Sequence, residues 1–566
     1  MQRKLILPAL FFISSICLEA QISSVPPLER RVTIYAENKT LESVLDDISA
    51  QAGFVFSYSP GFIDAQKIVS YQADNKPVRL VLANVLDNSV TCKTKGRYVI
   101  LQGGRADADK MRLEGYLYDS RTGEWISNAS VYDRTLMASA VTDRFGYFSI
   151  ELSPIDSLVS LQVSKSGYAD TSIITVSGSQ MNRLAEISMH SRDTSAGRQV
   201  SAFSKILPSW LIPENIRINS VNIKEIWPKS FQLSFVPGLS TNRLLGGNAE
   251  NRISLNILGG YSESVRYFEL GGLFNIVKNN SGYCQIGGIS NFVGGDFTGL
   301  QLAGINNSAS SANGVQAGGI INYTHNDSNI QLAGIANKSA ESILQISGIT
   351  SSATDKAQVQ IAGIANNADS ADVQIGGIIN CAGYLKTLQI SLINIADTSC
   401  GISIGLINIV KNGYHKIEFS TDEVLQANIA FRSGTKSFHG IITAGMAPFG
   451  SDKKIWGFGY GIGTTLGKSG KTAFDFDLSA TEICYGGDVS FENNLNRVYA
   501  GIDCRLSKKF SIAAGLTFNL LVTDTQNKYY GEVYSDIAPY NLIDSDTGQT
   551  DNIKSWIGIK LALRFL

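Results

Sequence analysis

The sequence is short of charge and of histidine, and each shortage excludes a class of function. Charged residues make up 17% of the 566 residues and the formal net charge is -1, so no electrostatic attraction to nucleic acid is expected. A zinc enzyme needs clustered ligands around an open metal position. The four histidines lack ligand spacing, so we expect no catalytic residue, metal or cofactor. They are His190, His325, His415 and His439.

Long hydrophobic runs are also missing. No stretch of roughly 18 apolar residues follows the first 20 residues, so no transmembrane helix is expected. Residues 1–20 have the pattern of a signal peptide: Arg3 and Lys4 are basic, Leu5 to Ile16 is apolar, and a cleavage site follows Ala20. Six cysteines remain beyond it, and without a CxxC pair they indicate neither a metal site nor a disulfide framework.

Glycine and aromatic residues, by contrast, are abundant. The chain has 54 glycines, 25 phenylalanines and 22 tyrosines, which is typical of β-structure that does not face water on every side. Its length indicates several domains. We therefore expect a mainly β protein with small modules over 30–103 and 112–190, a linker over 191–229 and a barrel over 230–566.

Residues 30–103 combine strand and helix patterns. Apolar residues at 41, 44, 45 and 48 share one helical face, Thr40 can cap this helix and Gly53 can end it. A second helix is expected at 78–86, and strands at 32–35, 54–58 and 98–101.

This order of elements resembles the STN module found at the N-termini of secretins and of TonB-dependent signal-transducing receptors. The matching segments are Thr-Leu-Glu-Ser-Val-Leu at 40–45, Gln-Ala-Gly-Phe at 51–54, and the helix and strand that follow. In that family the module docks periplasmic partners such as the C-terminal part of an anti-sigma regulator. The resemblance implies a partner of that type for residues 30–103, and a purely structural cap is the alternative.

Residues 112–190 carry turn signals roughly every ten residues, which predicts a small β-sandwich. The segment resembles the carboxypeptidase-regulatory-like domain, which is a non-catalytic appendage and so implies no peptidase activity. The linker over 191–229 is too short for the plug domain of a TonB-dependent receptor. The residues that carry the resemblance are Gly115, Asp119, Thr122, Gly123, Ala129, Val131, Thr142, Asp143, Gly146, Phe148, Gly167 and Tyr168.

The C-terminal part alternates with the period of a β-strand. In residues 557–565 the odd positions are apolar, whereas the even positions include Lys560 and Arg564. Such strands suit a bilayer, so we expect a transmembrane antiparallel β-barrel of roughly 18–22 strands in the outer membrane, with a soluble sandwich as the weaker alternative. The residues expected to face its lumen are Asp475, Asp477, Asp503, Arg505, Lys560 and Arg564.

A short unit recurs every 14 to 16 residues between 269 and 410, for example QLAGINN at 301–307 and QAGGIIN at 316–322. Its Gln and Asn are six residues apart and are expected on one strand face. A β-solenoid with stacked amides is the alternative architecture, but continuity with barrel-like strands on both sides favours the barrel. Similar repeats occur in uncharacterised bacterial envelope proteins and bring no known chemistry. In the barrel reading the lumen-facing amides include Gln331, Asn337, Gln360 and Asn366.

Residues 467–472, Gly-Lys-Ser-Gly-Lys-Thr, look like a phosphate-binding loop. That loop needs a glycine where this chain has Thr465, and the segment lies between two alternating strands. We expect a hairpin turn there.

Together these features favour a non-enzymatic outer-membrane barrel with two periplasmic modules that acts in envelope signalling or as a passive pore. Its expected partners are outer-membrane lipid, the barrel-assembly machinery and a periplasmic anti-sigma-type regulator. The alternative is a surface-exposed β-solenoid that binds glycan or protein. The sequence identifies no ligand or cargo.

Overall fold

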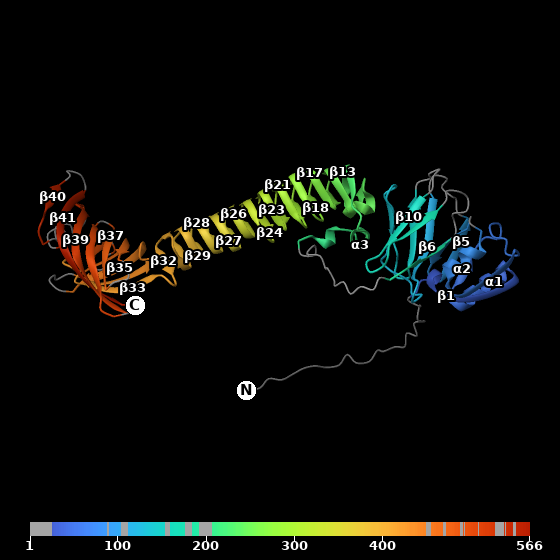
Figure 1. Cartoon of the computed structure of the whole chain (residues 1–566), viewed down its shortest axis with the longest axis horizontal. Coiled ribbons are helices and arrows are strands. Elements are labelled where there is room, and N and C mark those ends of the chain that lie inside the picture. Colours follow the sequence, from blue (N-terminus) through green and yellow to red (C-terminus); the bar gives the residue numbers. More distant parts are fainter. Residues whose placement is uncertain are drawn as a thin grey trace, which may run out of the picture. The chain divides into compact units, whose positions relative to one another are not determined.

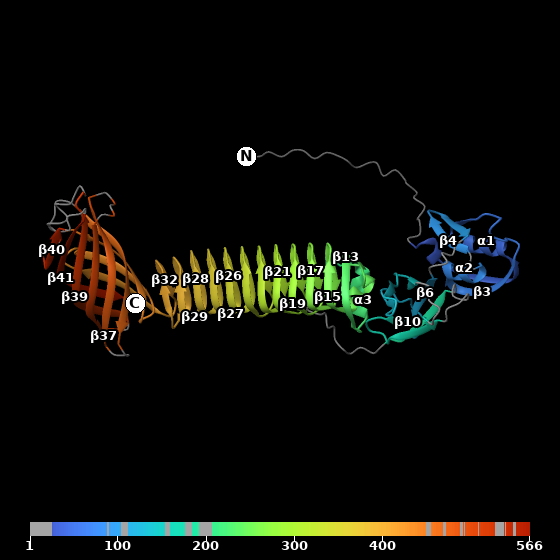
Figure 2. The ribbon, with the colours of Figure 1, turned by 90° about the horizontal axis from the view of Figure 1, so that it is seen from above.

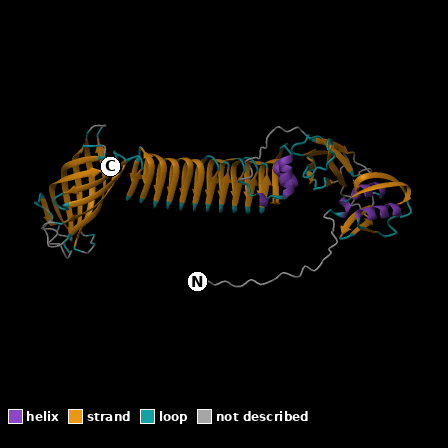
Figure 3. Cartoon of the chain, turned by 90° about the horizontal axis from the view of Figure 1, so that it is seen from below, coloured by secondary structure: helices purple, strands orange, loops and turns teal. Residues whose placement is uncertain are grey.

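The structure is a computed structural model. It describes residues 25–565 except 88–89, 104–110, 153–158, 176–183, 192–205, 449–453, 468–470, 487–488, 490, 492, 508, 527–536, 538 and 547–550. The expected signal peptide therefore lies outside the described residues. The chain divides into two compact units: the first comprises residues 1–197 and 214–224, and the second comprises residues 198–213 and 225–566. Figure 1 labels the elements, and Figure 3 shows how strongly strands predominate.

Within the described residues, no helix has both the length and the apolar character needed to cross a membrane.

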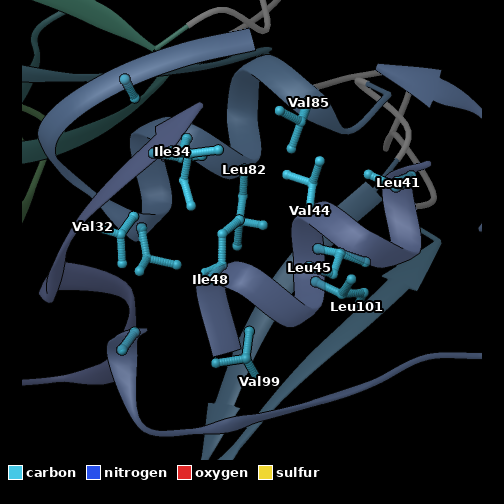
Figure 4. Close-up of a cluster of buried hydrophobic side chains, with 14 of the residues drawn as sticks. Val32, Ile34, Leu41, Val44, Leu45, Ile48, Leu82, Val85, Val99 and Leu101 are labelled. Carbon is cyan, nitrogen blue, oxygen red and sulfur yellow. The ribbon is translucent and has the colours of Figure 1, made fainter. Parts of the chain in front are cut away.

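The first unit begins with the small α/β module. Its predicted helices and strands are confirmed. Thr40 caps α1, accepting a hydrogen bond from Ser43 N at 3.4 Å, and Gly53 ends the helix with φ 68°. Both helices pack their apolar faces against the strands, in the core shown in Figure 4. The elements are η1 (Pro27–Glu29), β1 (Arg31–Thr40), α1 (Leu41–Ala52), β2 (Val55–Ser57), β3 (Ile68–Pro77), α2 (Val78–Val85), β4 (Val90–Lys95) and β5 (Tyr98–Gly103).

A β-sandwich follows, with one sheet in the order β11-β10-β7-β8 and the other in the order β12-β6-β9. Leu117, Val131 and Phe148 lie in the core between them. Helix α3 (Glu214–Asn222) returns to this sandwich after the linker, where Asn222 Nδ2 donates to Asn128 O at 2.8 Å. The strands are β6 (Met111–Asp119), β7 (Ser130–Asp133), β8 (Ala138–Val141), β9 (Tyr147–Leu152), β10 (Val159–Ser164), β11 (Thr171–Thr175) and β12 (Ala185–Met189).

A buried polar cluster joins the α/β module to the sandwich. Glu29 accepts hydrogen bonds from Arg79 Nε at 2.9 Å and from the Tyr116 hydroxyl at 2.6 Å. The Arg79 guanidinium also lies 4.1 Å from the ring centre of Tyr147. Burial raises the pKa of Tyr116, so its hydroxyl stays a proton donor toward Glu29. These contacts couple the two modules within the first unit.

The second unit begins with a parallel β-solenoid, in which each 14–16-residue repeat forms one coil (Figure 2). About eleven coils stack along one axis. The fourth residue of most repeats is a glycine at a corner: a Cβ on Gly319 would sit 2.1 Å from the carbonyl oxygen of Gly304 in the preceding coil. Backbone stacking at this corner leaves no room for a side chain.

The solenoid strands pair in register from coil to coil, Gln316 lying beside Gln331 for example. They are β13 (Trp227–Val236), β14 (Leu239–Ser240), β15 (Ala249–Asn256), β16 (Gly259–Ser262), β17 (Ser264–Gly271), β18 (Phe274–Val277), β19 (Ser281–Gly287), β20 (Ser290–Val293), β21 (Asp296–Ala303), β22 (Asn306–Ala309), β23 (Ser311–Gly318), β24 (Ile321–Thr324), β25 (Ser328–Ala333), β26 (Ala336–Ser347), β27 (Thr350–Ala362), β28 (Ala365–Gly376), β29 (Ile379–Ile390), β30 (Ile393–Ser399), β31 (Ile402–Ile404) and β32 (Ile407–Val410). The short helices η3 (Ser209–Leu211) and η4 (Arg243–Asn248) also belong to this unit.

An antiparallel barrel of eight strands closes the chain, and the prediction of 18–22 strands is wrong. The closing pair is β33 with β41, where Ile417 lies beside Phe565. The expected barrel strands from residue 230 onward are solenoid strands instead, because both kinds of strand alternate with the same period. The barrel strands are β33 (Tyr414–Thr421), β34 (Ala427–Gly434), β35 (His439–Ala447), β36 (Ile455–Leu466), β37 (Thr472–Tyr485), β38 (Asn493–Arg505), β39 (Phe510–Asp524) and β41 (Asp551–Phe565), and β40 (Ile543–Asp546) pairs beside β41.

The cluster around Glu29 gives a first prediction. A Glu29→Ala variant leaves the Arg79 guanidinium and the Tyr116 hydroxyl without their acceptor, so we expect the first unit to lose roughly 3 kcal/mol of stability. Deuterium uptake of peptides from β1 and β6, measured by mass spectrometry on the full chain, should rise together. Tyr116→Phe, which removes one hydrogen bond, should cost only about 1 kcal/mol. Wild-type uptake in the Glu29→Ala variant would contradict the coupling.

Candidate functional site

The amides predicted to face a barrel lumen point instead into the interior of the solenoid. Gln331 and Gln360 are fully buried, and Asn337 and Asn366 are 1% exposed. From Gln301 to Gln389, each glutamine of the ladder donates from Nε2 to Oε1 of the glutamine one coil earlier, at 2.7–2.9 Å. The prediction that these amides face inward is confirmed, but the interior that they face is that of the solenoid and not a barrel lumen. The glutamine ladder comprises Gln285, Gln301, Gln316, Gln331, Gln345, Gln360, Gln374 and Gln389.

Glu269 ends this ladder at the first coils. Its carboxylate accepts from Gln285 Nε2 at 2.7 Å and from Asn256 Nδ2 at 3.0 Å. Both oxygens of this carboxyl group accept hydrogen bonds, so Glu269 orients Gln285, and each amide then orients the next. At the opposite end, the Ser403 hydroxyl donates to Gln389 Oε1 at 3.3 Å. Burial raises the pKa of Glu269 to about 7, because no cation compensates its charge.

A second ladder, of asparagines, lines the opposite inner wall and runs the other way. Asn291 Nδ2, for example, donates to Oδ1 of Asn307 in the following coil at 2.9 Å. The ladder is interrupted where the repeat has Ser351 in place of asparagine, and there the buried Oδ1 of Asn366 has no hydrogen-bond partner. The neighbouring position, usually Gly or Ala, is Ser347, which bonds Ser351 through their hydroxyls at 2.9 Å.

The barrel interior holds a connected network of ion pairs. Arg432 donates to Glu418 at 2.7 Å and to both carboxylate oxygens of Asp477. Arg564 donates to Glu418 at 2.7 Å, to Asp475, and to Asp503 at 3.0 Å. Lys560 reaches the second oxygen of Glu418 at 2.6 Å. The two arginines and Glu418 are fully buried, so neighbouring charges replace their lost hydration.

Five of the six charged residues predicted to face the lumen therefore meet inside the barrel: Asp475, Asp477, Asp503, Lys560 and Arg564. Arg505 is exposed and lines a cavity of about 40 Å³ at the end of β38. Sequence reasoning did not single out Glu418 or Arg432. The alternation of the strand could have identified Glu418 as an inward residue, because it lies between Ile417 and Phe419, which both point outward.

Glycines on β36 leave room for this network. The four glycines at 457, 459, 461 and 463 occupy alternate positions, and a Cβ on Gly463 would sit 2.3 Å from Asp477 Oδ1. A second cavity, lined by Asp422, Arg497 and Lys560 among others, has a volume of about 30 Å³. Such a space holds a few water molecules at most. The described interior therefore holds paired charges beside two small cavities.

Residues 467–471 connect β36 to β37, and these two strands pair antiparallel, as expected of a hairpin. Residues 468–470 lie outside the described part.

The pKa of Glu269 gives a second prediction. Between about pH 4.5 and pH 7 this carboxyl stays protonated in the folded chain but ionises in the unfolded chain, so stability falls as pH rises through that window, by about 3 kcal/mol in total. Glu269→Gln should remove this dependence. The measurement is the urea concentration that exposes peptides from 264–303 to deuterium, at pH 5 and pH 7.5. An equal pH dependence in both proteins would contradict it.

The interruption at Ser351 gives a third prediction. Replacing Ser347 by Ala and Ser351 by Asn recreates the usual repeat and provides a donor for Asn366 Oδ1, so the double variant should be more stable by about 1 kcal/mol. Ser351→Asn alone should gain less, because the Ser347 side chain occupies the space. Deuterium protection of β27 and β28 in urea measures the difference. A double variant no more stable than the wild type would show that the interruption costs nothing.

Comparison of the chain with protein-family models, with curated proteins and with solved structures finds no match.

Proposed function

We propose that this chain is an outer-membrane protein whose eight-stranded barrel is a sealed anchor, and that the solenoid is a periplasmic spacer carrying the N-terminal modules for envelope signalling. The observation that carries the proposal is the two-sided chemistry of the barrel wall. Its outward side chains on β41 are Ile557, Ile559, Leu561, Leu563 and Phe565, all 40–60% exposed. Its inward side chains form the ion-pair network.

That arrangement is inverted relative to a soluble domain, which buries its apolar face and hydrates its charges. Exposed Phe474, Phe476 and Leu478 on β37 extend the apolar belt around the wall. Lipid is the solvent that suits such a belt, and barrels of this kind have alternating apolar and polar faces.

The connections between barrel strands support an orientation. At the end where the chain enters at Tyr414 and leaves at Phe565, the connections are the short segments 435–438, 467–471 and 506–509. The other end has the short segment 422–426, the seven-residue segments 448–454 and 486–492, and the long segment 525–550, which includes β40. Outer-membrane barrels have short periplasmic turns and longer extracellular loops. The end that joins the solenoid is then the periplasmic one.

A solenoid on that side is a stiff spacer. Its coils are joined by continuous backbone pairing and by two amide ladders, and eleven coils at the usual strand spacing give a length of roughly 50 Å. The solenoid then sets a fixed distance between its first coil and the barrel.

The N-terminal modules supply the signalling part of the proposal. The α/β arrangement over residues 31–103 agrees with the STN resemblance, and the two-sheet sandwich after it agrees with the carboxypeptidase-regulatory-like resemblance. A periplasmic anti-sigma-type regulator is the partner that the STN resemblance suggests. A passive pore is a weaker candidate, because the ion pairs fill the described barrel interior.

The anchor gives a fourth prediction. Membrane extraction should require detergent, and the unboiled chain should run faster than the boiled chain on a denaturing gel, because the sealed barrel resists unfolding. Planar bilayers containing the protein should show no steady conductance. Recovery in the soluble fraction would contradict the anchor, and a stable open channel would contradict the sealed interior.

The orientation is tested with single cysteines in a cysteine-free background. Gln526→Cys lies beyond β39 and Ser437→Cys lies between β34 and β35; both positions are exposed. In intact cells a membrane-impermeant maleimide should label Gln526→Cys only, and after permeabilisation it should label both. The reverse pattern would place the solenoid outside the cell.

A further inference from the structure

One face of the solenoid is an unbroken apolar surface. The residues immediately before and after each of the eight ladder glutamines point outward and align in two rows from coil to coil, and the rows continue through the residues that flank the aligned positions 232, 254, 269 and 403. All twenty-four positions are apolar. One row is Phe231, Ile253, Phe268, Cys284, Leu300, Val315, Ile330, Leu344, Val359, Val373, Leu388 and Ile402, and the other is Leu233, Leu255, Leu270, Ile286, Leu302, Ala317, Leu332, Ile346, Ile361, Ile375, Ile390 and Ile404.

A third row follows the corner glycines and borders this face. It contains an exposed Ile or Leu in each of ten consecutive coils, and all of these side chains are 39–55% exposed. We call the three rows together the aliphatic face. The corner row is Leu273, Ile289, Ile305, Ile320, Ile335, Ile349, Ile364, Ile378, Leu392 and Leu406.

The aliphatic face is larger than the apolar patches that soluble monomers usually expose to solvent. Strand geometry gives it a length of roughly 50 Å and a width of roughly 15 Å, about 750 Å² in area. The largest apolar patch on a typical soluble monomer is about 300–600 Å². A standard stable protein interface buries about 800 Å² per partner, so one further surface of this size would suffice.

We propose that the aliphatic face binds the same face of a second copy of this chain, giving a parallel dimer of solenoids. Three properties favour a second copy over other occupants. The face has no charge, so identical faces do not repel each other. Its side chains repeat at the spacing of stacked strands, so two copies can interdigitate as packed sheets do, about 10 Å apart. Its area matches a dimer interface.

The parallel orientation rests on the proposed membrane anchor. If both barrels lie in one membrane with their solenoids on the same side, the two aliphatic faces meet through a two-fold axis along the coil stack. Each coil then faces the same coil of its partner, and the contact is closed, without free copies of the face at its edges. Confinement to one membrane also raises the effective concentration of the two copies.

Cross-linking in isolated membranes tests the proposal. Single cysteines are placed on the aliphatic face at Ile330 or Leu332, and near its first coils at Leu270, in a cysteine-free background. The matched control is Lys338→Cys, an exposed outward position on the opposite wall of the same coil stack. With a short bis-maleimide, the Leu270 variant and at least one of the mid-face pair should give a homodimer band at least tenfold stronger than the Lys338 control.

Adding Ile346→Lys and Ile375→Lys to the cross-linking variant should abolish that band, because like charges then face each other across the interface. The two side chains are 37% and 38% exposed, so the coils should keep their deuterium protection. Absence of the homodimer band, cross-linking to a species of another mass, or labelling of the face by a lipid-soluble probe would overturn the proposal. The heat-dependent gel shift of the same samples reports separately on the barrel anchor.

Discussion

Close stacking of one coil on the next is the constraint on which the middle of this chain depends. Parallel backbone pairing brings successive corners very close together. The carbonyl oxygen of Gly304, for example, lies 2.1 Å from the place that a Cβ on Gly319 in the following coil would occupy. Glycine at the corner permits the approach, and the approach in turn aligns the side chains of successive coils. Amides inside the coil can then bond to their own copies, while aliphatic residues outside form continuous rows. Each position of the repeat therefore has its own structural role: glycine at the corner, amides inside and aliphatic residues outside.

The barrel solves a different problem with the same alternation. Here the strands pair antiparallel and close on themselves, so no backbone edge is left free between β33 and β41. Charges gather on the inside, where Glu418 receives Arg432, Arg564 and Lys560 at once. Removal of any one partner would leave buried charge without compensation, so the network has to be kept as a whole. In an eight-stranded barrel the interior is narrow, and these side chains occupy it.

Much of the local structure followed from the sequence, whereas the long-range pairing did not. The cap at Thr40, the stop at Gly53 and the faces of residues 557–565 are short-range features, and all were predicted correctly. The alternation of the repeats was also recognised, but a period of two residues is shared by parallel and antiparallel strands. What separates them is the partner of each strand, and Gln331 pairing with Gln316 at the same repeat position is a relation across coils. The near-equal length of successive repeats was the available sign of a solenoid. Glu418 and Arg432 were not singled out, because each lies in a strand of ordinary composition and gains its importance only from residues far away in the chain.

The two amide ladders have one consequence for the evolution of the molecule. Apart from the interruption at Ser351, each internal coil offers the next the same donors and acceptors, and the special end group, Glu269, lies at one end only. Whole coils can therefore be gained or lost by duplication or deletion of a repeat without disturbing either end of the rod. Each event changes the length by one strand spacing, about 4.8 Å. The length of the solenoid can thus change in small, equal steps while its cross-section and its two ends stay the same.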